Sequence, residues 1–189
     1  EVIERYGFGV TMITKSTKVL RDLDLLKKIN EKSKCVVQMT LTTYDEDLCR
    51  IVEPNVETTY ERFRALEILH DNGIPTVVWL CPILPFINDT EENIRGILDY
   101  CVRAKVKGII NFDMGVTLRD GNREYFYKKL DEHFPGLKEK YIRMYGNSYQ
   151  LSSPNSECIK NGIMCDVNEC FEYLNKYEDK YGGEQISLI

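Results

Sequence analysis

Apolar residues along this chain gather in four runs, at 8–13, 35–41, 76–84 and 108–112. Each run is dense in Val, Ile or Leu and has little polar alternation, which is typical of strands covered on both faces. Segments of helical periodicity separate the runs, as in repeated βα units. The pattern therefore predicts an α/β fold with four parallel strands.

Three segments between these runs have apolar residues three and four positions apart, as amphipathic helices do. The apolar positions are Leu23, Leu26 and Ile29; Phe63, Leu66 and Leu69; and Ile94, Ile97, Leu98 and Cys101. Thr58 with Glu61, and Asp89 with Glu92, have the spacing of a capping box. We therefore expect helices at 19–32 and 59–72 and a third capped at Asp89.

Beyond residue 112 the pattern changes to helices with polar faces. Asp120 and Gly121 mark a turn, and helices are expected at 122–134, 137–145 and 168–180, the last capped by Asp166 and Glu169. Residues 156–162 look like the end of a helix without its beginning, so we expect residues to be missing near 155–157. This tail is expected to wrap the sheet without extending it.

Composition excludes several functional classes. The net charge of −5, with acidic and basic residues interleaved, gives no basic stripe for nucleic acid. No apolar run approaches the roughly twenty residues that cross a bilayer. We expect a soluble, cytoplasmic protein without a membrane partner.

The seven cysteines do not suggest a shared function. Cys35, Cys81 and Cys101 lie in apolar patterns, where a reduced thiol behaves as a small hydrophobe, so free thiols are expected. The spacings of seven and five residues from Cys158 to Cys170 fit neither a zinc site nor a ferredoxin, which favours structural roles.

Polar residues follow each apolar run, where parallel βα proteins place their reactive groups. Lys15 and Ser16 follow the first run, and Thr40 and Thr42 end the second. A lysine beside hydroxyl groups suits an anionic, nucleotide-like ligand. The alternative is a solvated lysine beside ordinary β-branched strand residues.

Other chemistry has less support from the sequence. Glu53 and Arg62 form a candidate pair, or simply a salt bridge between a loop and a helix. His70 and His133 are the only histidines and neither follows a strand, which disfavours a histidine triad or a zinc hydrolase. No glycine-rich phosphate loop or nucleophile elbow is present.

An ordered set of short segments resembles a known family. The segments are 13–16 (ITKS), 20–26 (LRDLDLL), 39–45 (MTLTTYD), Glu53-Pro54, Arg62, 72–75 (NGIP) and 82–89 (PILPFIND). From about Tyr6 to about Thr117 they resemble radical S-adenosylmethionine (SAM) proteins related to spore photoproduct lyase, often called DNA repair photolyases. Each segment alone is weak evidence, but their order and spacing argue against a chance match.

This resemblance implies a partial (β/α)6 TIM-type barrel, of which the chain holds the last four strands at 1–117, with a helical extension at 118–189. It implies a CxxxCxxC motif that binds a 4Fe-4S cluster, and this motif is absent from the 189 residues. Residues 1–7 look like the end of a helix, without an initiator methionine, so the motif is expected upstream. As it stands, this fragment is expected to be inactive.

In that family the reduced cluster cleaves SAM and yields a 5′-deoxyadenosyl radical, which abstracts hydrogen from a substrate. An electron donor such as flavodoxin or ferredoxin is implied. By position, Lys15 and Thr40 resemble cofactor-contacting residues, and Ser16 and Thr42 lie beside them.

The resemblance also implies roles for three later residues. Arg62 meets the methionine carboxylate, Glu53 orients Arg62 or binds SAM, and the backbone at Pro82 lies along the adenine. No substrate-binding residue transfers, so the reaction stays open between lyase and oxidoreductase types. Two alternatives remain: a non-redox barrel enzyme acting on a phosphorylated or acidic metabolite, and a nucleotide-binding module without catalysis.

Overall fold

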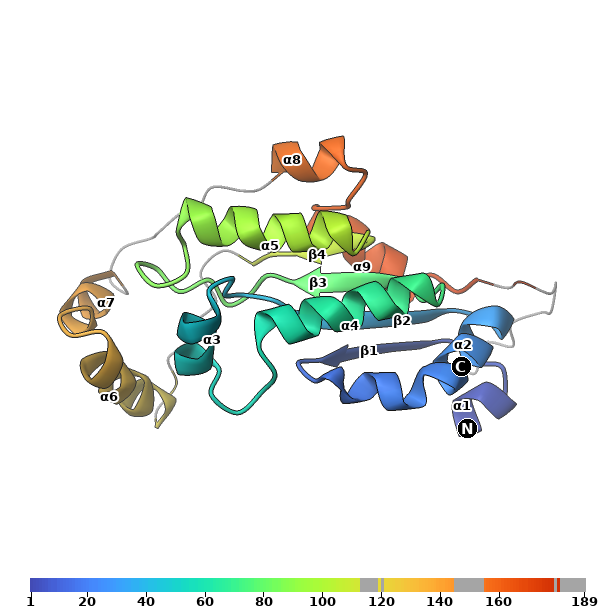
Figure 1. The fold of residues 1–189 in the computed structure, drawn as a ribbon, viewed down its shortest axis with the longest axis horizontal. Helices are drawn as coiled ribbons and strands as arrows, with labels where there is room; N and C mark the ends of the chain where they lie inside the picture. The colour runs from blue at the N-terminus through green and yellow to red at the C-terminus, as the bar shows by residue number, and fades with distance from the viewer. Residues whose placement is uncertain (113–118, 120, 145–154, 179, 181–189) are drawn as a thin grey trace.

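The computed structural model describes residues 1–112, 119, 121–144, 155–178 and 180 (Figure 1). Four parallel strands alternate with helices in this part of the chain. The elements are α1 (Val2–Arg5), β1 (Val10–Thr14), the 3-10 helix η1 (Thr17–Asp22), α2 (Leu23–Lys32), β2 (Cys35–Thr40), α3 (Glu46–Val52), α4 (Thr59–Asp71), β3 (Thr76–Trp79), α5 (Glu91–Arg103), β4 (Gly108–Ile110), α6 (Asn122–His133), α7 (Lys138–Met144), α8 (Asn155–Lys160) and α9 (Val167–Asn175).

The four strands form one sheet in the order β1-β2-β3-β4, with every neighbouring pair parallel. This arrangement confirms the predicted α/β fold. It is the order that consecutive units of a barrel have, because each right-handed crossover places the next strand beside the last. All four strands therefore end at the same edge of the sheet.

Helices α2, α4 and α5 cover one face of the sheet (Figure 1). Met39 and Val78 point to this face and pack against Phe63 and Leu66 of α4 and Ile97 of α5. The apolar positions predicted for the three helices all belong to these clusters. The helical periodicity therefore identified the packed side of each helix correctly.

Helix α9 covers part of the opposite face, where Cys170 and Leu174 pack against Val36, Val77 and Ile110. It does not reach β1, whose Ile13 is 54% exposed. The prediction that all strands are covered on both faces is therefore wrong for β1. Within the described residues, nothing packs over that end of the sheet.

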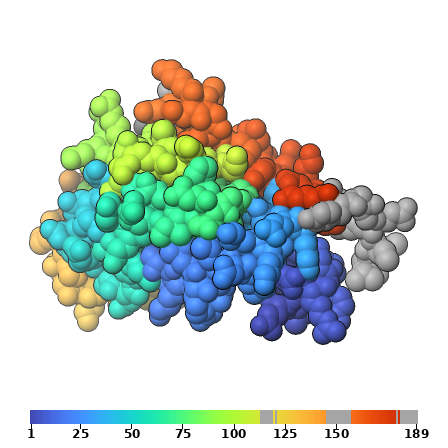
Figure 2. Space-filling model, turned by 45° about the vertical axis from the view of Figure 1, so that its right-hand side comes forward, coloured from blue at the N-terminus to red at the C-terminus, as the bar shows by residue number. Residues whose placement is uncertain are grey.

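The tail does more than wrap the sheet. Met164 forms a parallel bridge with Gly108, donating to Lys107 O and accepting from Ile109 N. Helices α6 and α7 pack through Leu130 and Tyr141 on the segments after β2 and β3. They lie with α3 at the end toward which the strands point (Figures 1 and 2). The predicted boundary between residues 117 and 118 lies outside the described residues.

The helix starts test the predicted capping pairs. Thr58 and Glu61 form the expected capping box of α4, and Asp166 caps α9 by accepting from Glu169 N. The cap of α5 is Thr90, because the Asp89 carboxylate instead accepts from Phe86 N in the preceding turn. The prediction missed α3, which begins after the cap residue Asp45.

The cysteines test another expectation. Cys158 and Cys165 form a disulfide, whereas the remaining five are free. Cys35, Cys81 and Cys101 are free as expected. The Cys158–Cys165 disulfide fits the structural role expected for this group but was not itself predicted; Gly162 turns the chain back between α8 and Met164. Among the described residues, no helix is both long and apolar enough to cross a membrane.

Replacing Gly108 by Ala should disturb the docking of α9. The added Cβ would lie 2.9 Å from Cys170 Sγ and 3.3 Å from Met164 O. We expect the free energy of unfolding to fall by about 1 kcal/mol in urea denaturation, because overpacking a dense site is unfavourable. In the double variant with Cys170→Ala the two losses should not add; additive losses would contradict this contact.

Candidate functional site

The carboxyl ends of the strands bring three predicted residues together. Lys15 follows β1 directly, Thr40 ends β2, and Arg62 reaches the same edge from α4. Glu53, at the end of α3, lies between the two cations. Residues distant in sequence therefore meet beside one rim of the sheet.

Glu53 accepts hydrogen bonds from both cations, one on each carboxylate oxygen. Lys15 Nζ lies 2.5 Å from Glu53 Oε1, and an Arg62 nitrogen donates to Glu53 Oε2. The Glu53 side chain is 7% exposed, Arg62 is fully buried, and Lys15 is 39% exposed. In this Lys15–Glu53–Arg62 cluster, only the lysine offers its charge to solvent or to a ligand.

Arg62 donates hydrogen bonds to three further groups of the protein besides Glu53. It donates to Thr40 O at 2.7 Å, to Thr58 O at 3.3 Å and to Cys49 Sγ at 3.4 Å. Because Arg62 belongs to α4, these bonds tie the end of β2 to the start of α4 and to the middle of α3. The geometry therefore favours the expected alternative in which Arg62 and Glu53 orient each other, and it leaves Lys15 as the accessible cation.

The cluster keeps Glu53 ionised. Burial raises the pKa of this carboxyl, but the charges of Arg62 and Lys15 and the hydrogen bonds that both donate outweigh it, so the pKa lies below its ordinary value. Two cations against one carboxylate leave a net charge of +1. A ligand carboxylate at this rim would meet a favourable potential.

The other predicted residues lie near this cluster without joining it. Ser16 donates to Glu57, and Pro82 follows a cis peptide bond with Cys81. Thr42 is 1% exposed, and its carbonyl accepts from Asn88 and Asn93 at the start of α5. Thr42 therefore fastens β2 to α5 from within the core.

A chain of polar contacts that the sequence did not reveal crosses the face of the sheet that α9 partly covers. Trp79 Nε1 donates to Gln38 Oε1 at 2.6 Å, and Gln38 Nε2 donates to Thr11 Oγ1 at 2.7 Å. Trp79 also packs against Phe112 and Phe171, with ring centroids 5.8 and 6.2 Å away. An amide in an otherwise apolar strand, two residues before Thr40, was the available signal.

Two further groups mark this edge. Burial raises the pKa of the Cys81 thiol, while the charge of Lys15 and a backbone hydrogen bond from Phe112 act in the opposite direction. Asn111, just after β4, has a buried Oδ1 with no hydrogen-bond partner within the described chain. Hydrogen-bonding capacity therefore remains at the ends of the strands.

The described residues contain no group of three His, Cys, Asp or Glu side chains placed to hold a metal ion. The chemistry available from these residues is the binding and orientation of a polar, anionic molecule.

Comparison with known protein families matches residues 1–101 to the Radical SAM superfamily. The match covers more than half of the 189 residues, and the chain belongs to this superfamily. This membership agrees with the α/β fold of the chain.

Three relatives are similar over part of the chain. An uncharacterized protein of Mycobacterium tuberculosis is 26% identical over 157 residues, covering 83% of this chain and 46% of that protein. One from Methanocaldococcus jannaschii is 35% identical over 82 residues, covering 43% and 30%. One from Acidianus two-tailed virus is 27% identical over 128 residues, covering 67% and 42%. The chain thus spans less than half of each relative.

Among solved structures, Streptococcus suis SuiB bound to S-adenosylmethionine is similar at 15% identity, with a TM-score of 0.47. The similarity covers 76% of this chain and 31% of that one.

Removing the buried arginine should destabilise the protein strongly. Arg62→Met leaves the buried Glu53 carboxylate with one cation and Thr40 O without this donor, so we expect a loss of about 3 kcal/mol in urea denaturation. Arg64→Met, on the same helix but in an exposed ion pair with Glu67, should cost less than about 1 kcal/mol. Equal losses would show that Arg62 is no more important than a surface residue.

The lowered pKa of Glu53 predicts a pH dependence of stability. Its contribution is fully present above about 4.5, the ordinary pKa, and is lost as the pH falls through the depressed folded value. Acidification below pH 4.5 should therefore lower the unfolding free energy more steeply in the native protein than in Glu53→Gln. Parallel pH profiles, measured by urea denaturation, would refute this.

Proposed function

We propose that the complete protein is a radical SAM enzyme that binds SAM at the carboxyl ends of β1, β2 and β3. Superfamily membership supports this class, and the convergence of Lys15, Glu53 and Arg62 beside Thr40 carries the assignment of the site. The same family match favours this function over a non-redox barrel enzyme or a binding module.

The chemistry of the residues fits SAM. The Lys15 ammonium is accessible and suits the methionine carboxylate, because an ammonium binds carboxylates as a point charge. The Thr40 side chain lies on the same face of the sheet as Trp79, its register partner. A hydroxyl and an aromatic edge there suit the ribose and adenine.

Glu53 and Arg62 act as positioning residues in this proposal. Arg62 has no exposed surface, so its contribution passes through Glu53 and the carbonyl of Thr40. Glu53 in turn fixes the Lys15 ammonium at the rim. A preformed cation reduces the conformational entropy that binding would otherwise cost.

We expect the cysteines that would hold a 4Fe-4S cluster to lie outside these 189 residues, as the sequence resemblance implies. When bound, the reduced cluster would supply the electron that cleaves SAM and generates a 5′-deoxyadenosyl radical for hydrogen abstraction. In this chain, Lys15 binds, Glu53 and Arg62 orient, and the sheet excludes water from one side of the site.

The proposal extends to the subfamily, the cellular location and the electron donor. We infer a spore photoproduct lyase-like subfamily, a cytoplasmic location and a flavodoxin or ferredoxin as electron donor, on the basis of the sequence resemblance.

Replacing Lys15 should weaken SAM binding. In the complete, cluster-reconstituted protein, Lys15→Ala should raise the Kd for SAM about tenfold, because one charge-assisted hydrogen bond is lost. Equilibrium dialysis measures this Kd without turnover. Thr40→Val should give a smaller increase.

Lys18→Ala is the matched control, since Lys18 is an exposed lysine three residues further on in η1. It should bind SAM as the native protein does. An unchanged Kd in Lys15→Ala would remove the site assignment, whereas a complete protein that binds no SAM would overturn the proposed function itself.

A further inference from the structure

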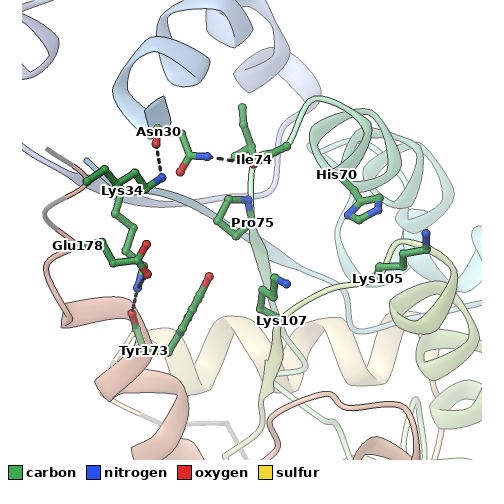
Figure 3. A pocket seen from close by; sticks show the side chains of 11 residues that line it. Asn30, Lys34, His70, Ile74, Pro75, Lys105, Lys107, Tyr173 and Glu178 are labelled. Carbon is green, nitrogen blue, oxygen red and sulfur yellow. Dashed lines mark hydrogen bonds and ion pairs between the residues drawn. The ribbon is translucent and has the colours of Figure 1, made fainter. Parts of the chain in front are cut away.

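A pocket lies at the opposite edge of the sheet from the Lys15–Glu53–Arg62 cluster, where the strands begin (Figure 3). It has a volume of about 340 Å³ and is lined by the turns that lead from α2, α4 and α5 into the next strand. Lys34, Pro75 and Lys107 hold equivalent places in these turns, each one residue before its strand. The βα repeat therefore places one lysine on each side of a proline.

The pocket is strongly basic, although the chain as a whole carries −5. Four lysines and one glutamate, Glu178, line it, which gives a formal charge of +3. One histidine, His70, also lines the pocket. The carboxyl ends of α4 and α5 each contribute roughly half a negative charge. With the carboxyl end of α2, which leads to Lys34, counted in the same way, a net positive charge of about one and a half remains for a ligand.

Two of these lysines have ammonium groups that are not engaged. Lys105 and Lys107 are exposed, and neither side chain has a hydrogen bond or an ion pair with another described residue. Figure 3 shows Lys107 beside Tyr173 and below Pro75, with Lys105 and His70 on the side of the pocket away from Tyr173. Both charges are therefore available at the pocket.

Lys105 also occupies a position that normally favours glycine. Its φ is +50°, and Val106 N bonds back to Cys101 O to close the end of α5. At the end of α4 the same place is held by Gly73, with φ +74°. A lysine in the left-handed region is strained, and strain of this kind points to a role for the side chain.

The other wall of the pocket is built from the tail. Lys34 is 5% exposed, donates to Tyr173 O, pairs with Glu178 and lies 3.8 Å from the centre of the Tyr173 ring. Lys180 donates to Asn30 O. These bonds fix two cations and one aromatic ring without using Lys105 or Lys107.

We propose that this pocket binds a small phosphorylated molecule through a phosphate or pyrophosphate group held by Lys105 and Lys107. Lysine ammonium groups bind phosphate as point charges, and several together favour an anion with more than one negative charge. The volume suits a pyrophosphate-sized group with a small organic part. The proposal does not depend on SAM binding at the other edge.

The probe is inorganic pyrophosphate, titrated calorimetrically into the complete protein at low ionic strength. The native protein should bind it, and Lys107→Gln should weaken binding about tenfold. Higher salt should weaken it further, since exposed charges are screened. Lys128→Gln, an exposed lysine on α6 at the other end of the molecule, is the matched control and should bind normally (Figure 1).

Lys105→Gly separates binding from folding. Glycine relieves the left-handed strain, so the thermal unfolding midpoint should not fall, while pyrophosphate binding should weaken about tenfold. ADP as a second probe decides whether a nucleoside adds affinity to the phosphate contact. Absence of pyrophosphate binding, equal effects of Lys107→Gln and Lys128→Gln, or binding of duplex DNA in its place would overturn the proposal.

Discussion

The arrangement of the rim depends on the hydrogen bonds that the buried Glu53 carboxylate accepts from two cations. Its two oxygens accept from Lys15 and from the buried Arg62, and Arg62 also holds the carbonyl of Thr40. A buried guanidinium without such partners would be very unfavourable, so the ends of β1, β2, α3 and α4 are fixed relative to one another. The accessible lysine is thereby set in place before any ligand arrives.

The two edges of the sheet have different constructions because parallel strands are polar. At the carboxyl edge, polar residues from consecutive strands converge with a buried ion pair and an aromatic group, Trp79. At the amino edge, the short turns after the helices present lysines, and the tail supplies Tyr173 and Glu178. One fold therefore carries two separate concentrations of positive charge in an acidic protein.

The tail joins both regions to the core. Helix α9 packs on the face of β2, β3 and β4 opposite the three large helices, and Gly108 is small enough to admit Cys170. Helices α6 and α7 pack near the carboxyl edge through Leu130 and Tyr141. The uncovered side of β1, with Ile13 exposed, leaves the sheet open at one edge among the described residues.

The sequence by itself determined the four parallel strands, the buried faces of α2, α4 and α5, and the residues at the rim. Hydrophobic periodicity, and which residues follow each strand along the chain, are local properties. Only the tertiary structure decided that the predicted pair of Arg62 and Glu53 is buried, that Thr42 lies in the core, and that Cys158 pairs with Cys165. The hydrogen bond from Trp79 to Gln38 also became visible only in the tertiary structure. Contacts between segments distant in sequence depend on packing, which no local pattern specifies.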